Sequence, residues 1–240
     1  MYLSWNNLLF VVIATFSLLV QAQSPSQHKE QNQADTMAKR MQACTTCHGA
    51  QGVTSNTAYF PRIAGKPAGY LFNQLQNFKE GRRHYGLMVG MVEHLSDAYL
   101  LEMAQYFANL DLPYPALVPL KTPASEASLQ LGKTLSLQGD KPRNIPACTA
   151  CHGVALIGVQ PSIPALLGLP RDYLAAQLGA WQTGLRRAHA PDCMGRVAKL
   201  LQPADVDAVA NWLASQPVPA NTKPATSLPQ PMTEQCGGVK

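Results

Sequence analysis

The sequence predicts an all-α protein made of two small helical domains in tandem. The first observation is an internal repeat, in which residues 34–110 recur as residues 125–216. The second is an apolar pattern of helical period in both copies, and the third is the lack of an alternating strand pattern of useful length. Of the 240 residues, 46% are hydrophobic and 14% are charged, which excludes a disordered chain.

The first segment of the chain reads as an export signal. Residues 8–20 carry no charged side chain, and Val20-Gln21-Ala22 follows as a small-residue cleavage pattern. The apolar run is shorter than the ~20 residues that a membrane-spanning helix needs. We therefore expect residues 1–22 to be a signal peptide that is removed. No Lys or Arg precedes the run, and an uncleaved anchor that keeps the protein at the membrane is the alternative.

The two copies are recognised by identities that occur in one order. Cys44-Thr45-Thr46-Cys47-His48 recurs as Cys148-Thr149-Ala150-Cys151-His152, at an offset of 104 (148 − 44). The offset then becomes 103 and later 106, with these matches among others: Pro61 and Pro164, Gly65 and Gly168, Tyr70 and Tyr173, Gln74 and Gln177, Gly81 and Gly184, Met88 and Met194, Ala104 and Ala210. Each copy is a domain of about 80–90 residues, which is small enough to need help in building a core.

Proline marks the segments outside the two copies. Residues 111–124 contain four prolines, so we expect a semi-rigid linker there. Residues 217–240 contain five prolines and little apolar periodicity, so we expect a C-terminal tail without a helix.

Two helices are predicted in each copy. The last one shows apolar residues at i, i+3, i+4 and i+7, with Ser96 as a plausible N-cap in the first copy and Pro203 in the first turn in the second. An earlier helix repeats three large apolar positions. In the last helix these residues are Leu100, Met103, Ala104 and Phe107 in the first copy and Val206, Val209, Ala210 and Leu213 in the second. In the earlier helix they are Leu71, Leu75 and Phe78 in the first copy and Leu174, Leu178 and Trp181 in the second.

The repeated Cys-x-x-Cys-His motif carries the chemistry. In a helical segment, residues i and i+3 face the same way, so two thiols can bond to the two vinyl groups of one porphyrin while the adjacent His binds its iron. There are two alternatives. One is a zinc site built from both Cys-x-x-Cys pairs, although such a site favours pairs that are closer in the sequence. The other is a thioredoxin-like redox pair, although that motif favours a βαβ setting. The motifs predict two covalently bound haem c groups held by Cys44, Cys47, His48, Cys148, Cys151 and His152.

Over residues 34–216 the chain resembles the tandem class I cytochrome c domains of the dihaem cytochrome c4 family, a group of exported bacterial electron carriers. The resemblance rests on the Cys44 to His48 motif with Gly49 and Gly52, on Pro61 to Gly65, and on Gly69-Tyr70-Leu71 with Gln74-Leu75. It departs from the family pattern in the longer path from Val154 to Gly158. The resemblance implies that each domain wraps around one haem, and that the carbonyls of Pro61 and Pro164 accept a hydrogen bond from the ligating histidines.

A class I domain also needs a sixth iron ligand, and Met is the usual one. Met88, Met91 and Met103 compete in the first copy. The repeat separates them, because Met88 matches Met194 whereas the other two match Val197 and Val209. The predicted iron ligands are His48, Met88, His152 and Met194, with His84 and His189 held in reserve and a merely space-filling Met88 as the alternative.

Two further sets of residues have open roles. Arg82-Arg83 and Arg186-Arg187 match at an offset of 104, and either pair with haem propionates or are solvated surface arginines. Cys193 and Cys236 are not needed for haem, and we expect them to form one disulfide in an oxidising compartment. A sharper alternative makes Cys193 an axial thiolate in place of Met194.

Function follows from the expected ligand sets. The net charge of +5 comes with no Lys/Arg block, so a nucleic-acid surface is not indicated. Two irons that each have His and Met leave no open position for a substrate, which predicts a periplasmic electron carrier that is not an enzyme. The resemblance implies a quinol-oxidising complex or a periplasmic dehydrogenase as donor and a terminal oxidase as acceptor, with a peripheral place at the membrane left open. The alternatives are a haem subunit of a dehydrogenase complex and a dihaem peroxidase-like enzyme with one open iron site.

Overall fold

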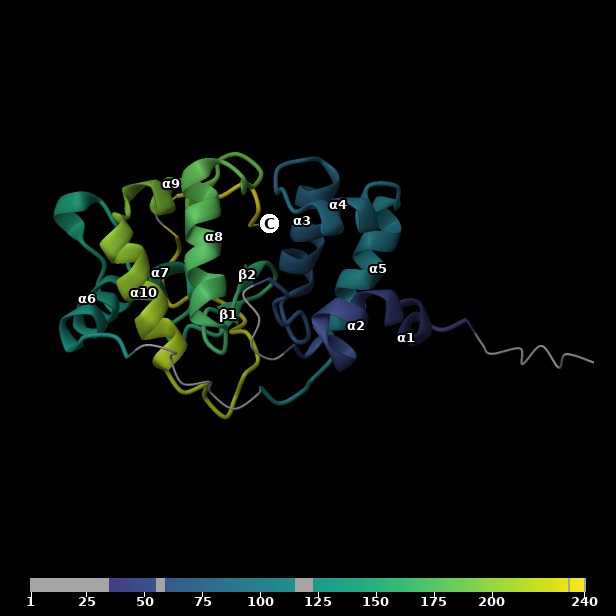
Figure 1. Cartoon of the computed structure of the whole chain (residues 1–240), viewed down its shortest axis with the longest axis horizontal. Coiled ribbons are helices and arrows are strands. Elements are labelled where there is room, and N and C mark those ends of the chain that lie inside the picture. The colour runs from purple at the N-terminus through teal and green to yellow at the C-terminus, as the bar shows by residue number, and fades with distance from the viewer. Residues whose placement is uncertain (1–34, 55–58, 115–122, 233, 240) are drawn as a thin grey trace, which may run out of the picture. The chain divides into compact units, whose positions relative to one another are not determined.

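The computed structural model describes residues 35–54, 59–114, 123–232 and 234–239. The chain is mostly helical in these ranges (Figure 1), which confirms the all-α class. The described strands are two residues long each, β1 (Gly158–Val159) and β2 (Ile163–Pro164), and they pair antiparallel. The predicted signal peptide and most of the predicted linker lie outside the described residues, so both stay predictions, as do the domain boundaries.

In the residues that the structure describes, the first copy contains the two predicted helices and three shorter ones. The bounds are α1 (Met37–Arg40), α2 (Gln42–His48), α3 (Ala68–Lys79), α4 (Gly86–Val92) and α5 (Asp97–Ala108), with a 3-10 turn at Ala50–Gly52. Ser96 caps α5, because its side chain accepts a hydrogen bond from the backbone N–H of Tyr99. The predicted core face is buried at Leu71, Phe78, Leu100, Met103, Ala104 and Phe107.

In its described residues the second copy contains the two predicted helices, α8 (Arg171–Thr183) and α10 (Pro203–Ser215), and three that apolar periodicity does not predict. These three are α6 (Glu126–Leu137), α7 (Thr149–His152) and α9 (Cys193–Leu200), and a 3-10 turn lies at Lys141–Arg143. The helix α10 starts at Pro203 as predicted, and Gln202 and Asp205 form a capping box there. Val206, Val209 and Leu213 are buried in one apolar cluster with Leu135 of α6.

Helices α6 and α10 approach each other closely at Gly132. A Cβ atom at this position would lie 2.1 Å from the carbonyl oxygen of Ala208, which is backbone and cannot rotate away. We expect Gly132→Ala to lower the free energy of unfolding by about 3 kcal/mol, because the helices must separate to admit a methyl group. The measurement is chemical denaturation of the holoprotein.

A matched control for this substitution exists in α8. Gly179 is also helical, and a Cβ atom there would meet nothing within 4 Å. Gly179→Ala should raise the free energy of unfolding by up to about 1 kcal/mol, the usual helical advantage of Ala over Gly. Equal effects of the two substitutions would contradict the close approach at Gly132.

The two copies meet where the chain leaves α3 and α8, within one compact unit that spans residues 35–240. The N–H of His84 donates to the carbonyl of Leu185 at 2.8 Å, and the N–H of Arg187 donates to the carbonyl of Arg82 at 2.7 Å. These bonds are equivalent at an offset of 103 (187 − 84 and 185 − 82), so the two copies contact each other with corresponding segments.

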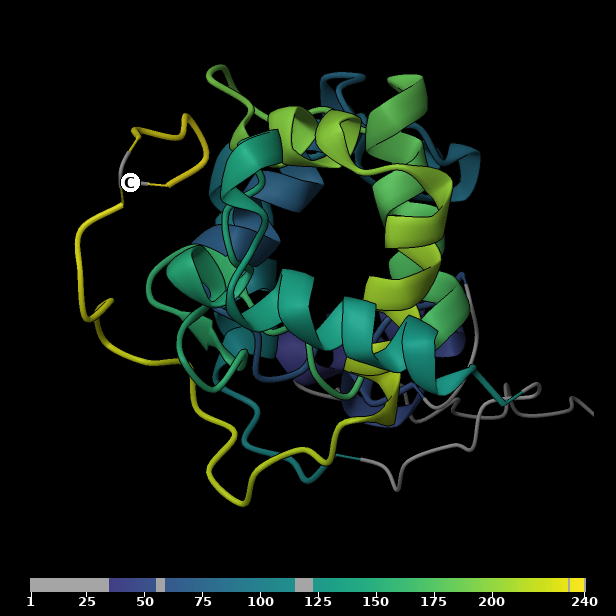
Figure 2. The ribbon, with the colours of Figure 1, turned by 90° about the vertical axis from the view of Figure 1, so that its left-hand side faces the viewer.

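The described part of the tail is irregular, as predicted, and runs extended along the second copy (Figure 2). The N–H of Ala225 donates to Gly158 at 2.9 Å, and the N–H of Gln160 donates back to Ala225 at 2.8 Å. Near its end, the Nδ2 atom of Asn73 in α3 donates to the carbonyl of Gly238 at 2.6 Å. The tail is therefore fixed to both copies. Among the described residues, no helix is long and apolar enough to cross a membrane.

Candidate haem sites

The first Cys-x-x-Cys-His motif lies on α2 and lines a cavity of the first copy. His48 is 8% exposed, and its Nδ1 atom lies 2.8 Å from the carbonyl oxygen of Pro61. Because a carbonyl only accepts, Nδ1 carries the proton and donates it, which leaves the lone pair of Nε2 free for iron. Burial lowers the pKa of His48, so the imidazole is kept neutral, as a metal ligand must be.

The second motif begins at the N-cap of α7, Cys148, continues along that helix and lines a separate cavity. The Nδ1 atom of His152 lies 2.8 Å from the carbonyl oxygen of Pro164, and burial lowers the pKa of this His as well. The expectation that Pro61 and Pro164 orient the two histidines is thus confirmed as geometry. Both sites present a neutral imidazole held by a backbone acceptor.

The four motif thiols do not fit the two alternative readings. Burial raises the pKa of Cys44 and raises that of Cys148 to about 11, whereas a reactive redox thiol needs a lowered pKa. Cys44 and Cys47 line the first cavity, and Cys148 and Cys151 line the second, so the two pairs do not converge on one ion. The arrangement therefore supports neither a thioredoxin-like pair nor a four-thiolate zinc site.

Each cavity holds the methionine that the repeat indicates. Met88 on α4 lines the first cavity and Met194 on α9 lines the second, and both are half-buried. Met91 and Met103 also line the first cavity, and Val197 and Val209 line the second at the matching positions. The structure thus brings all the competing methionines to the same cavity, and the choice of Met88 still rests on the repeat.

Two methionines that line the cavities among the described residues were missed by the sequence analysis. Met41, directly before α2, is buried and lines the first cavity. Met232, in the tail, lines the second cavity. Its sequence position gave no signal, because only the chain's path around the second copy brings the tail there.

The reserve histidines also lie at the cavities. His84 is exposed and lines the first cavity, and His189 is half-buried and lines the second. The Nε2 atom of His189 is 2.9 Å from Nη2 of Arg82, and because a guanidinium only donates, Nε2 accepts this bond. His94 is exposed, and His28 lies outside the described residues.

The predicted repeat offset of 104, which matches Arg82 with Arg186, is wrong by one residue. Arg83 and Arg186 face each other in an antiparallel bridge, at an offset of 103 (186 − 83). Arg83 stacks on Phe78 at 4.6 Å, and Arg186 stacks on Trp181 at 3.8 Å, the aromatic residue of its own copy in each case.

Both arginines bind groups of both copies. Arg83 donates to Gln74 at 3.0 Å and to Gln177 at 2.6 Å, and Arg186 donates to Gln177 and to Gln74, each at 2.9 Å. Arg186 is only 5% exposed, so the solvated-surface alternative is wrong for it. The pair joins the two copies through neutral amide side chains.

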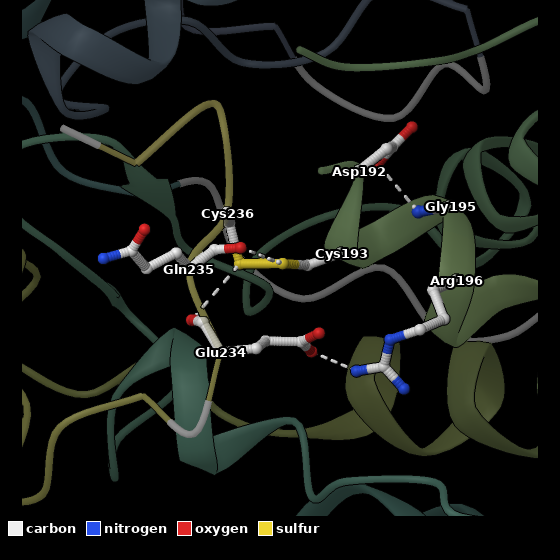
Figure 3. The surroundings of a disulfide bond; sticks show 7 residues. All are labelled: Asp192, Cys193, Gly195, Arg196, Glu234, Gln235 and Cys236. Atoms are coloured by element: carbon white, nitrogen blue, oxygen red, sulfur yellow. Dashed lines mark hydrogen bonds and ion pairs between the residues drawn. A yellow bond between two sulfur atoms is a disulfide. The ribbon is translucent and has the colours of Figure 1, made fainter. Parts of the chain in front are cut away.

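The two cysteines outside the haem-binding motifs form the expected disulfide. Cys193 at the start of α9 is bonded to Cys236 of the tail, with the two Cα atoms 5.6 Å apart (Figure 3). An ion pair between Arg196 and Glu234 lies beside it. Because its sulfur is in the disulfide, Cys193 is not an axial thiolate, and that alternative is wrong. The bond holds the tail next to Met194.

The cavities suit a porphyrin on two counts. Their linings are mostly apolar, as the faces of a macrocycle require. The indole Nε1 of Trp181 is buried on the second cavity without an acceptor among the described residues. Arg83 lines the first cavity and Arg186 lines both, and neither has a carboxylate partner among the described residues. The carboxylates of a haem are the acceptors and counter-charges that these groups lack.

An all-α fold with two Cys-x-x-Cys-His motifs, each placing a buried His on an apolar cavity, defines a c-type cytochrome, which carries covalently bound haem c and transfers electrons. The chain belongs to the dihaem cytochrome c4 family.

Similarity to known proteins supports this assignment. Residues 130–217 match the cytochrome c family. The chain is 39% identical over 185 residues to the "Thiosulfate dehydrogenase electron acceptor" of Thiomonas intermedia, covering 77% of this chain and 83% of that protein. It is 30% identical over 210 residues to cytochrome c4 of Pseudomonas aeruginosa, covering 87% of this chain and 98% of that one.

A solved structure of thiosulfate dehydrogenase from Marichromatium purpuratum matches as well. It superposes with a TM-score of 0.64 and 32% identity over 73% of this chain. This chain covers only 36% of that longer one.

Proposed function

We propose that this cytochrome is a periplasmic electron carrier, not an enzyme, that accepts electrons from a dehydrogenase acting on thiosulfate and passes them to a downstream acceptor. The observation that carries the choice of donor is the 39% identity to a protein named as the electron acceptor of thiosulfate dehydrogenase, against 30% to a cytochrome c4. The predicted signal peptide supports the compartment.

Eight side chains would hold the two haem groups. Cys44 and Cys47 in one copy and Cys148 and Cys151 in the other would form the thioether bonds, with His48 and Met88, and His152 and Met194, as the axial ligands. All eight line the cavity of their own copy. The bound iron supplies reversible one-electron chemistry. The protein's own part is to keep Nδ1 of each His protonated against a proline carbonyl and to surround the group with apolar side chains.

A layer of mostly polar side chains separates the two sites. Of the described residues, six line both cavities: Lys66, Tyr70, Gln74, Tyr173, Gln177 and Arg186. One layer of side chains thus lies between the two groups, which supports electron exchange between the two copies within one molecule.

The donor is tested by mixing the oxidised holoprotein with a purified thiosulfate dehydrogenase and thiosulfate. We expect the haem absorption bands of the reduced form to appear on addition of the enzyme, and no change with thiosulfate alone. The control is ferricyanide as an artificial acceptor, which shows that the enzyme is active. Reduction of ferricyanide without reduction of the cytochrome would reject this donor.

The absence of an enzymatic role is tested by carbon monoxide. Six-coordinate His/Met iron has no free position, so the reduced holoprotein should show no carbon monoxide spectrum without denaturant. Stoichiometric binding to one haem would favour the peroxidase-like alternative.

A second candidate is a permanent haem subunit of such a dehydrogenase. It is favoured by the match of this chain to 36% of the longer thiosulfate dehydrogenase chain from Marichromatium purpuratum. Gel filtration of the cytochrome with the enzyme distinguishes the two roles, since a carrier elutes alone and a subunit elutes in the complex.

A further inference from the structure

The feature that the proposed function leaves unexplained is a buried lysine between the two cavities. Lys66 is 5% exposed and lines both cavities. In the described ranges its ammonium group has no hydrogen bond or ion pair, and its nearest charge-stabilising contact is the ring of Tyr70, whose centroid is 6.0 Å away. The matching position of the second copy is Leu169 (66 + 103), so the repeat does not require a charge here.

No carboxylate of the described chain offsets this charge. The neighbouring Arg62 is also buried; it donates to the carbonyls of Ala64, Leu112 and Pro113 and stacks on the ring of Tyr114 at 4.2 Å, so none of its partners in the described chain is a carboxylate. Arg186, on the same two cavities, donates to Tyr70, Gln74 and Gln177, none of which is a carboxylate. A buried cation without an anion costs several kcal/mol. Haem carboxylates are the anions that cofactor attachment brings to these cavities, so the cost is offset only in the holoprotein.

Lys66 belongs to the first copy but lies against the second. Three residues further on, the N–H of Gly69 donates to the carbonyl of Pro161 at 3.0 Å. A Cβ atom on Gly69 would lie 2.8 Å from that oxygen, so the two segments are in close contact. The segment after Pro161 carries the carbonyl of Pro164 that orients His152. The first domain thus places a cation at the haem site of the second.

We propose that Lys66 is a potential-setting residue that raises the reduction potential of the haem in the other domain as well as that of its own. This rests on the proposed haem sites. Gain of one electron lowers the charge of the iron by one, and a fixed cation within about 10 Å stabilises the reduced form relative to the oxidised form. The charge of Lys66 therefore links the electron affinity of the second site to the packing of the first domain against it.

The test is a spectroelectrochemical titration of the holoprotein with Lys66→Met. We expect the equilibrium constant for reduction of the second haem to fall about tenfold, a shift of 59 mV to lower potential. The titration step of the second haem is identified with Met194→Ala, which should displace that step alone. Lys66→Arg keeps the charge and should keep the potential, and Lys66→Gln is a second neutral variant of similar length.

The outcomes separate this inference from the function on which it rests. A lower potential of the second haem in both neutral variants, with the two haems and the helix content retained, supports the role of Lys66. If the wild type shows two haem steps and the neutral variants leave the second step unchanged, the role of Lys66 is wrong and the haem sites stand. If the wild type lacks two haem steps, the proposed function itself fails.

Discussion

Replacing Cys148 and Cys151 by serine is expected to remove the second haem from the purified protein and to leave the first in place. The two thioether bonds would be lost at α7, and the axial ligands would then hold the group only reversibly. The two motifs line separate cavities, so attachment at one site does not need thiols of the other. Haem content per chain, measured from the pyridine haemochrome spectrum, should fall by half.

The mirror variant is the matched control. Changing Cys44 and Cys47 to serine should also halve the haem content, and the remaining haem should be the second. Covalent retention of both groups in either variant would show that the motif cysteines are not the attachment points. This result would also leave the four motif thiols without a role.

The second large effect is expected at the axial methionines. Met88→Ala and Met194→Ala should each remove about half of the near-infrared sulfur-to-iron absorption of the oxidised protein. Loss of the thioether ligand should also lower the potential of the affected haem, because thioether sulfur favours ferrous iron. The measurement is the near-infrared spectrum of each variant at equal haem content.

Met91 supplies the control within the same cavity. It lines the first cavity beside Met88 but matches Val197 of the second copy, so Met91→Val should keep the full band. Loss of the band in Met91→Val, with retention in Met88→Ala, would exchange the two assignments. Such a result would mean that the repeat does not align the ligand-bearing segments.

The helices were predictable where large apolar residues make the core contact. The last helix of each copy follows the i, i+3, i+4, i+7 pattern, and these positions are buried. Helix α6 was not predicted, because small residues make its contact with α10: Gly132 and Ser136 are buried alongside Leu135. A helix packed through small residues gives little signal to an analysis of apolar periodicity.

The candidate site was predictable in part. The positions of Pro61 and Pro164 followed from the family resemblance, and the repeat led to Met88 and Met194. Arg83 of the first copy donates to Gln177 of the second, and Arg186 of the second copy donates to Gln74 of the first. These hydrogen bonds between the copies could not be predicted, because they depend on how the two copies face each other. Sequence comparison of the copies could have singled out Lys66, since a lysine replaces an apolar residue there, but its burial is visible only in three dimensions.

Covalent attachment of two haem groups to one chain is tested most directly by intact mass measurement of the purified, denatured protein, combined with extraction by acidified acetone. We expect the mass of the processed chain plus two haem groups, with the colour retained in the protein precipitate. A mass equal to that of the bare chain, or transfer of the pigment into the acetone, would contradict covalent attachment at both motifs.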